Sequence, residues 1–199
     1  SHPHVQLRVT ALGSDRSLKV LRDGLVDVAI VMDNERLTTS PDMSVQPLYE
    51  EPVEVLMAAD HPLTQFDQVP WAALAEYPQV VFKDGYGMQR LVQAQFEQSG
   101  GELHAALELN TLDAFRGVVR QGQLTALLPQ SALTEGQPDP TLAIRPTEAP
   151  TLSRRVVLVT TSDRLVIPII RDFCQLVMER GACFLPPPSS PQLLSVEPV

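Results

Sequence analysis

The feature that most constrains this chain is a strand, a helix and a second strand that follow one another within its first thirty or so residues. Val5–Leu12 alternates enough to predict a strand, and residues 13–15 then open a helix that carries Leu18 and Leu21. Val26–Val31 is nearly continuous and β-branched, which is typical of a strand buried on both faces of a parallel sheet. Such a unit predicts an α/β fold with a right-handed crossover.

The middle of the chain holds a second alternating series. Its pattern predicts strands over 79–83, 104–109 and 124–128 and helices over 88–98 and 112–121. Two strand-like runs, 44–49 and 52–59, come before this series, and a strand over 155–161 and a helix over 166–180 come after it. The first and last parts of the chain therefore resemble two halves of a separate α/β layer.

This organisation predicts two α/β lobes, of which the first is discontinuous. The first lobe is expected to comprise residues 1–49 and 146–185 and the second lobe residues 50–145, while 186–199, with five prolines, is expected to be a tail. The extended stretches Leu48–Leu56 and Leu142–Ala149 are expected to form a two-strand hinge. A cleft between the lobes follows, where both sheets present the C-terminal ends of their strands and where open α/β sheets bind ligands.

Charge and hydropathy argue against two classes of function. The chain has 15 Lys+Arg against 24 Asp+Glu, a net charge of −9, and no basic run longer than Arg154-Arg155. Phosphate contacts need a surplus of basic residues on one face, so this chain is not expected to bind nucleic acid by itself. The longest apolar runs, 156–161 and 165–170, are far shorter than the roughly 20 residues of a membrane span, and no signal peptide is evident.

Cysteine usage gives no sign of a metal or cofactor. Cys174 and Cys183 lie nine residues apart, with no CxxC motif and no His at ligand spacing. Neither a disulfide framework nor a zinc site is expected, and two such cysteines suit a reducing cytosol. We expect no cofactor.

Four strand-to-helix junctions are predicted to line the cleft. They are Gly13-Ser14, Lys83-Asp84-Gly85, Asn110-Thr111 and Leu128-Pro129-Gln130-Ser131. Helix N-termini hold anions through free backbone N–H groups, and the Ser14, Thr111 and Ser131 hydroxyls and the Lys83 ammonium could add to this. The junctions together predict a site for a small carboxylate or phosphate metabolite. Taken singly, each hydroxyl has an alternative role as a helix N-cap.

Catalytic motifs are absent or weak. The sequence contains no GxSxG, HExxH or GxxxxGK[ST], and Gly85-Tyr86-Gly87 lacks the third glycine of a dinucleotide fingerprint. Glu50 and Glu51 are adjacent at the expected hinge, but neighbouring residues on a strand point to opposite faces. We interpret them as polar contacts of the hinge, with a solvated pair as the alternative, and we expect the chain not to be an enzyme.

Several segments together resemble the effector-binding domain of LysR-type transcriptional regulators. The resemblance rests on "HPHVQLRV", "LGSDRSLKVLRDGLVDVAIV", "LYEEPVEVLMAADHPL", "LNTLDAFRGVVRQGQLTALLP" and "RRVVLVTTSD", in this order and spacing. It extends from about Pro3 to Arg180, although Gln123 and Thr125 replace residues that are usually small in the family. Family domains also begin with a strand and a helix before the opening segment, so we expect both to be missing from the first lobe of this chain.

The resemblance implies a two-lobed periplasmic-binding-protein-like (type II) fold with its hinge near Leu48 and Ile144. The ligand-facing residues that it implies are Ser14, Lys83, Asp84, Gly85, Asn110, Thr111, Leu128 and Pro129. It further implies a cytoplasmic homodimer or homotetramer that senses a small inducer, and that contacts operator DNA through an N-terminal winged helix-turn-helix absent from these residues.

Two other function classes remain open from the sequence alone. A solute-binding receptor of a transport system uses the same two-lobed fold, and the sequence upstream would discriminate it by a signal peptide in place of a helix-turn-helix. An enzyme on this fold would need an acid–base pair or a phosphate-handling motif.

Overall fold

The computed structural model describes residues 4–33, 40–83, 87–134 and 139–181 of the chain. Its elements are α1 (Ser14–Arg22), β1 (Val28–Met32), β2 (Met43–Ala58), the 3₁₀ helix η1 (Pro62–Gln65), α2 (Trp71–Ala75), β3 (Gln79–Phe82), α3 (Gly87–Gln98), β4 (Ala105–Leu109), α4 (Leu112–Val119), β5 (Thr125–Pro129), α5 (Gln130–Thr134), β6 (Leu142–Arg145), β7 (Ser153–Thr161), α6 (Ser162–Leu165) and α7 (Pro168–Gly181). The α/β fold expected from the sequence is confirmed. In the middle of the chain, the observed element boundaries lie within about two residues of the predicted ones.

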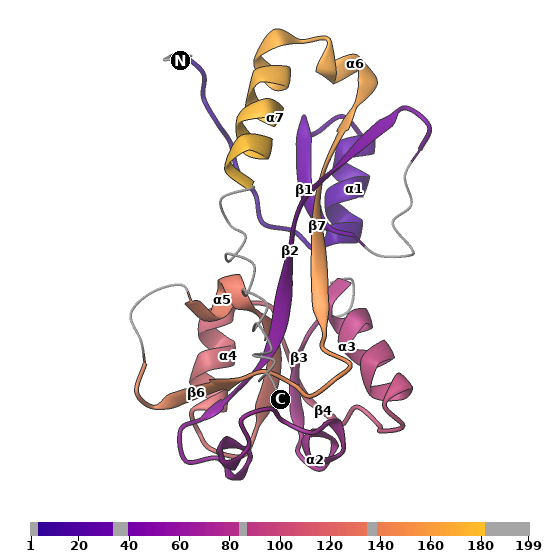
Figure 1. Cartoon of the computed structure of the whole chain (residues 1–199). Helices are drawn as coiled ribbons and strands as arrows, with labels where there is room; N and C mark the ends of the chain where they lie inside the picture. Colours follow the sequence, from indigo (N-terminus) through magenta and orange to yellow (C-terminus); the bar gives the residue numbers. More distant parts are fainter. Residues whose placement is uncertain (1–3, 34–39, 84–86, 135–138, 182–199) are drawn as a thin grey trace, which may run out of the picture.

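All seven described strands belong to one sheet in which β2 is the shared element (Figure 1). The strand order is β1-β7-β2-β5-β3-β4, with β6 also paired to β2. The pairs β3–β4 and β3–β5 are parallel, whereas β1–β7 and every pair that involves β2 are antiparallel. In Figure 1, β1, α1, α6 and α7 gather at the upper end of β2 and β7, and α2 to α5 with β3, β4 and β6 gather at the lower end.

The segment that first passes from the upper to the lower end of the molecule is a single strand, β2, instead of the two predicted runs. Strand β2 continues through Glu50 and Glu51 for 16 residues, and its register with β7 shifts between Pro47 and Tyr49. Proline has no N–H to donate to a sheet, so an irregularity beside Pro47 is expected. Hydropathy alone suggested a break because the acidic pair interrupts the apolar pattern.

The return crossing also differs from the prediction. Residues 142–145 do not accompany the middle of β2, because β6 pairs with its far end, from Val55 to Ala58. The chain that runs antiparallel to the middle of β2 is the start of β7, where Ser153 faces Pro52. Both segments are short, extended and half-polar, so the sequence pattern did not discriminate between them.

The opening segment is not a strand in this structure. Residues 5–13 have no regular secondary structure, and Val5, Leu7 and Val9 are 51%, 67% and 81% exposed. An alternating pattern forms a strand only when a neighbour takes up its backbone hydrogen bonds. Strand β1 is also not part of a parallel pair as predicted: it is antiparallel to β7, and its other edge has no partner among the described residues.

The last predicted helix is divided in two. A short α6 precedes α7, which begins at Pro168, a residue favoured at the first helical position because its missing N–H is not needed there. Within the stretch predicted as one helix, Cys174 of α7 is buried, whereas Ile167 lies before α7 and is exposed.

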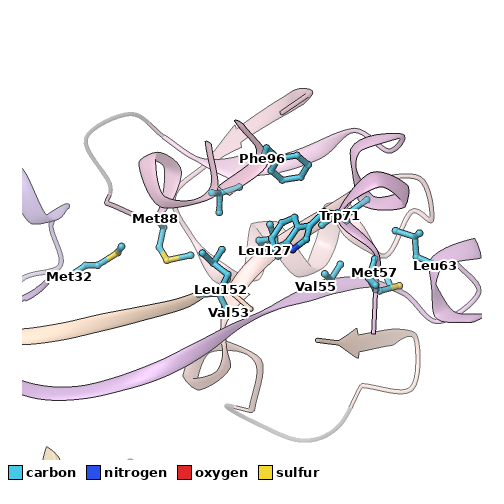
Figure 2. Packing of buried hydrophobic residues seen from close by; sticks show 13 residues of the cluster. Met32, Val53, Val55, Met57, Leu63, Trp71, Met88, Phe96, Leu127 and Leu152 are labelled. Carbon is cyan, nitrogen blue, oxygen red and sulfur yellow. The ribbon is translucent and has the colours of Figure 1, made fainter. Parts of the chain in front are cut away.

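Three apolar clusters form the core. The largest fills the lower end of the molecule, where Trp71 packs edge-on against Phe96 with ring centroids 5.6 Å apart. Figure 2 shows Met32 and Met88 at one end of this cluster and Leu63 at the other. A second cluster packs α1 against β1 and β7, and a third surrounds α4. Met32 belongs to β1, so the large cluster joins the two ends of the molecule.

Candidate functional site

A pocket of about 670 Å³ lies between the elements at the two ends of the molecule. Its lining comes from α1, β1 and β7 on one side and from α3, α4 and α5 on the other. The residues that line it are Leu12, Ser14, Ile30, Val31, Met32, Tyr49, Phe82, Gly87, Met88, Leu112, Pro129, Ser131, Ala132, Thr134, Arg154 and Val156. This volume is in the range of small-molecule sites.

Four helices begin at this pocket. Ser14 is the first residue of α1, Gly87 of α3 and Leu112 of α4, and Ser131 is the second residue of α5. The first backbone N–H groups of a helix have no partner within it and lie at the positive end of its dipole. The pocket is therefore lined by the starts of the same four helices whose junctions the sequence singled out.

Two of the predicted ligand residues line the pocket. Ser14 is buried, and its Oγ accepts a hydrogen bond from the Met32 backbone N–H at 3.2 Å. This bond ties the start of α1 to the end of β1, and the N-cap of α1 is Gly13 in place of Ser14. Pro129 closes β5 at the wall of the pocket, opposite Val53 of β2 in the ladder.

The other predicted ligand residues lie elsewhere. Lys83 and Asn110 are exposed, as is Thr111, which is the N-cap residue of α4 but makes no side-chain capping bond. Strand alternation explains the position of Lys83, because the adjacent Phe82 lines the pocket instead. Next to Thr111, Leu112 at the start of α4 lines the pocket. Leu128 is buried in the cluster around α4 and does not line the pocket. Asp84 and Gly85 fall outside the described residues.

A buried carboxylate that the sequence did not single out for binding lies beside the pocket. Glu51 is only 4% exposed and accepts hydrogen bonds from the Ser131 backbone N–H at 2.7 Å and the Ser131 hydroxyl at 3.1 Å. It also accepts from Arg154 Nε at 2.8 Å and pairs with Arg154 Nη2 at 2.7 Å. The Ser131 hydroxyl is thus engaged with Glu51 and does not serve as an N-cap.

Strand alternation separates the two glutamates as predicted. Glu50 is exposed and its carboxylate accepts a hydrogen bond from the Ser153 hydroxyl. Glu51 points to the other face, where Arg154 is its directly opposed residue in the β2–β7 ladder. The interpretation as polar contacts between crossing strands holds, and the alternative of a solvated pair is wrong for Glu51. No local signal could have indicated Arg154, which is 103 residues away.

An ion pair connects α1 and α3, the helices that begin at Ser14 and Gly87 of the pocket lining. Arg90 donates two parallel hydrogen bonds to Asp15, at 2.9 and 3.0 Å. Asp15 lies in the first turn of α1, where a negative charge is favourable. The pair connects the helix that begins at Ser14 to the helix that begins at Gly87, so it holds two walls of the pocket together.

The chemistry of the lining is mostly apolar. Arg154 is the single charged side chain among the described residues that line the pocket, and the hydroxyls of Ser14, Ser131, Thr134 and Tyr49 are the other polar side-chain groups. Burial raises the pKa of the Tyr49 phenol, and the nearby Arg154 charge offsets part of this rise. The arrangement suits binding of a small molecule with an apolar body.

Within the part of the chain that the structure describes, no three His, Cys, Asp or Glu side chains gather where they could hold a metal ion. In the same residues, no helix combines the length and apolar character that crossing a membrane requires.

Comparison with known proteins identifies the family. The family model described as the LysR substrate binding domain matches residues 1–182. This chain belongs to that family. The resemblance drawn from the sequence is therefore confirmed, and so is the expectation that the chain is a regulator's ligand-binding domain and not an enzyme.

A curated relative from Synechococcus elongatus, a "probable nitrogen assimilation transcriptional activator", is 56% identical over 177 residues. The match covers 89% of this chain and 57% of the relative, so the chain spans little more than half the length of that relative.

Two solved structures show the same fold. The regulatory domain of Synechocystis CcmR in complex with 2-PG has a TM-score of 0.79 at 20% identity, covering 90% of this chain and 85% of that one. The effector-binding domain of QuiR in complex with shikimate has a TM-score of 0.73 at 20% identity, covering 87% of this chain and 80% of that one.

Proposed function

We propose that this chain is the inducer-sensing and oligomerisation domain of a LysR-type transcriptional regulator. A small metabolite binds in the pocket between α1, α3, α4 and α5, and this changes the DNA binding of a winged helix-turn-helix that precedes these residues in the whole cytoplasmic protein. The observation that carries the proposal is the pocket itself, lined by residues in the first turns of four helices.

The architecture that we propose is the two-lobed type II periplasmic-binding-protein-like fold. The lower elements with β3 to β6 form the second lobe, and β1, α1, α6 and α7 form the discontinuous first lobe. The crossing strands, β2 beside the start of β7, form the hinge. Support comes from β2, in which nine of the first ten residues pair with β7 and the last six pair with β5 or β6.

The ligand site that we propose includes Ser14, Pro129, Arg154 and the first backbone N–H groups of α1, α3 and α4. Ligand binding regulates the protein only if the ligand has different affinities for two arrangements of the lobes. Residues from both ends of the molecule line this pocket, so a change in their separation alters the ligand contacts.

The partners that we propose are a small inducer, operator DNA through the preceding domain, and a second or further copies of the chain. The edge of β1 that has no partner among the described residues and the exposed alternating residues Val5, Leu7 and Val9 support a further proposal. A strand and helix from the segment before residue 1 complete the first lobe, with the added strand taking up the hydrogen bonds of β1. The chain's net charge of −9 is consistent with DNA contacts made by another domain.

The test is a thermal-shift screen of the protein with its preceding segment against central-metabolism carboxylates and phosphates. A ligand at a hundredfold excess over its Kd stabilises the folded state by about 2.7 kcal/mol. Thr134→Trp, which places an indole at the pocket wall from an exposed position, should abolish the shift. Ala94→Trp, at an exposed position of α3 that does not line the pocket, should retain it. A shift that survives Thr134→Trp would contradict the site.

A further inference from the structure

The pocket has an unusual charge balance for a site that would take an anion. Arg154 is the single charged side chain that the described residues contribute to its lining. The carboxylate of Glu51 lies directly behind this guanidinium and pairs with both Nε and Nη2, at 2.8 and 2.7 Å. The positive charge of the pocket wall is therefore cancelled by a neighbour within the protein.

Glu51 also accepts hydrogen bonds from α5. The backbone N–H and the hydroxyl of Ser131, a residue of the pocket wall, are both directed to its carboxylate. With Glu51 only 4% exposed, water screens this carboxylate little, and its field reaches the pocket through the protein. A second anion that approached Arg154 would have to share these donors with Glu51.

The rest of the lining offers little to a highly charged ligand. Leu12, Ile30, Phe82, Leu112 and Val156 contribute apolar surface from five separate elements or segments. Taking a charge away from water into such surroundings is costly unless an opposite charge compensates it. One charge on the ligand can still be met by Arg154 and by helix N–H groups, whereas a second finds no further cationic side chain among the described residues that line the pocket.

We propose that Glu51 sets the charge selectivity of the pocket. By neutralising Arg154, it restricts the ligand to molecules with an apolar body and at most one negative charge, and it disfavours dianions. Glu51 acts through Arg154 without touching the ligand, so it is a positioning residue. This inference rests on the proposed function, because it assumes that the pocket binds a small molecule.

The test compares benzoate with phthalate, which share a ring but carry one and two negative charges at pH 7.5. Affinities are measured by isothermal titration at constant ionic strength for the wild type, Glu51→Gln and Glu50→Gln. Glu50 is the matched control, because it is the preceding residue of β2 and points to the opposite, exposed face. Inorganic phosphate serves as a dianion without an apolar body.

The wild type and Glu50→Gln should bind benzoate and should prefer it to phthalate by about tenfold or more, with inorganic phosphate weaker still. Glu51→Gln leaves Arg154 uncompensated, so phthalate affinity should rise and the preference should fall toward unity. A purely structural role would lower thermal stability and weaken both ligands equally, leaving their ratio unchanged. Thermal unfolding of each variant therefore accompanies the titrations.

An unchanged ratio in Glu51→Gln, an equal change in Glu50→Gln, or a wild type that prefers phthalate would each overturn the inference. So would the absence of benzoate binding at 10 mM. None of these results contradicts the proposed function if a metabolite from the screen binds and Thr134→Trp abolishes its binding. If no metabolite responds to Thr134→Trp, the proposed site fails as well.

Discussion

The ion pair between Asp15 and Arg90 should couple α1 to α3 by a measurable free energy. Two charges about 4 Å apart attract by about 1 kcal/mol in water and about 4 kcal/mol near a protein surface of effective dielectric constant 20. The side chains of Arg90 and Asp15 are 28% and 51% exposed, which places the pair near the aqueous limit. Exposed pairs contribute about 0.2–1 kcal/mol, and the two parallel bonds favour the upper value. We expect a coupling free energy of about 1 kcal/mol.

A double-mutant cycle with Asp15→Asn, Arg90→Gln and the double variant isolates this coupling from the other contacts of each residue. Unfolding free energies from urea titration at 0.1 M and 1 M NaCl provide the data. The coupling should fall markedly at the higher salt, where the screening length decreases from about 10 Å to about 3 Å. A coupling below about 0.3 kcal/mol at low salt would refute the argument that this pair holds the two pocket walls together.

Three further outcomes are expected. Burial lowers the pKa of His61, whose Nδ1 accepts from the Leu63 N–H, so protonation is disfavoured in the folded state. The free energy of unfolding should therefore decline as the pH falls below about 6.5. His61→Asn keeps an N-cap acceptor, so urea titrations of this variant at several pH values should lack this part of the pH dependence. Phe115→Ala should cost about 3–5 kcal/mol by the same assay, because Phe115 is fully buried, whereas Leu107→Ala at an exposed site should cost less than about 1 kcal/mol. Gly24→Ala should lower stability by about 1 kcal/mol, because Gly24 ends α1 at φ +72°, and a calorimetric Tm equal to wild type would contradict this.

The elements that the sequence predicted well are those whose signals are local. Helix α4 has Phe115 and Val119 at helical spacing and Gly122 beyond its end, and β5 is a continuous apolar run, so both appear close to their predicted bounds. Val5–Leu12 carries an equally clear alternation but forms no strand, because a strand depends on a neighbour that the pattern cannot specify. A local pattern therefore predicts which conformation a segment favours, whereas pairing with a neighbouring strand decides whether a strand forms.

The sequence predicted which helix N-termini form the candidate site, but not which side chains line it. Junctions between strands and helices indicated which parts of the chain meet, and residues in the first turns of α1, α3, α4 and α5 do line one pocket. Which side chain faces the pocket depends on register, so Lys83 and Thr111 were predicted one residue away from Phe82 and Leu112, whereas Pro129 was predicted correctly. The sequence indicated Glu51 as a polar contact between strands but could not indicate its partner Arg154, because the pairing arises from the β2–β7 ladder, across 103 residues of chain.

Methionine methyl groups offer the most direct test of the central claim, that this pocket is the effector site. The chain has five methionines, of which Met32 and Met88 line the pocket, whereas Met57 is buried within the large core cluster. With ¹³C-methyl methionine and NMR detection, a ligand from the screen should shift the Met32 and Met88 signals and leave Met57 and Met178 in place. Shifts confined to Met57 or Met178, with Met32 and Met88 unmoved at saturation, would contradict the account.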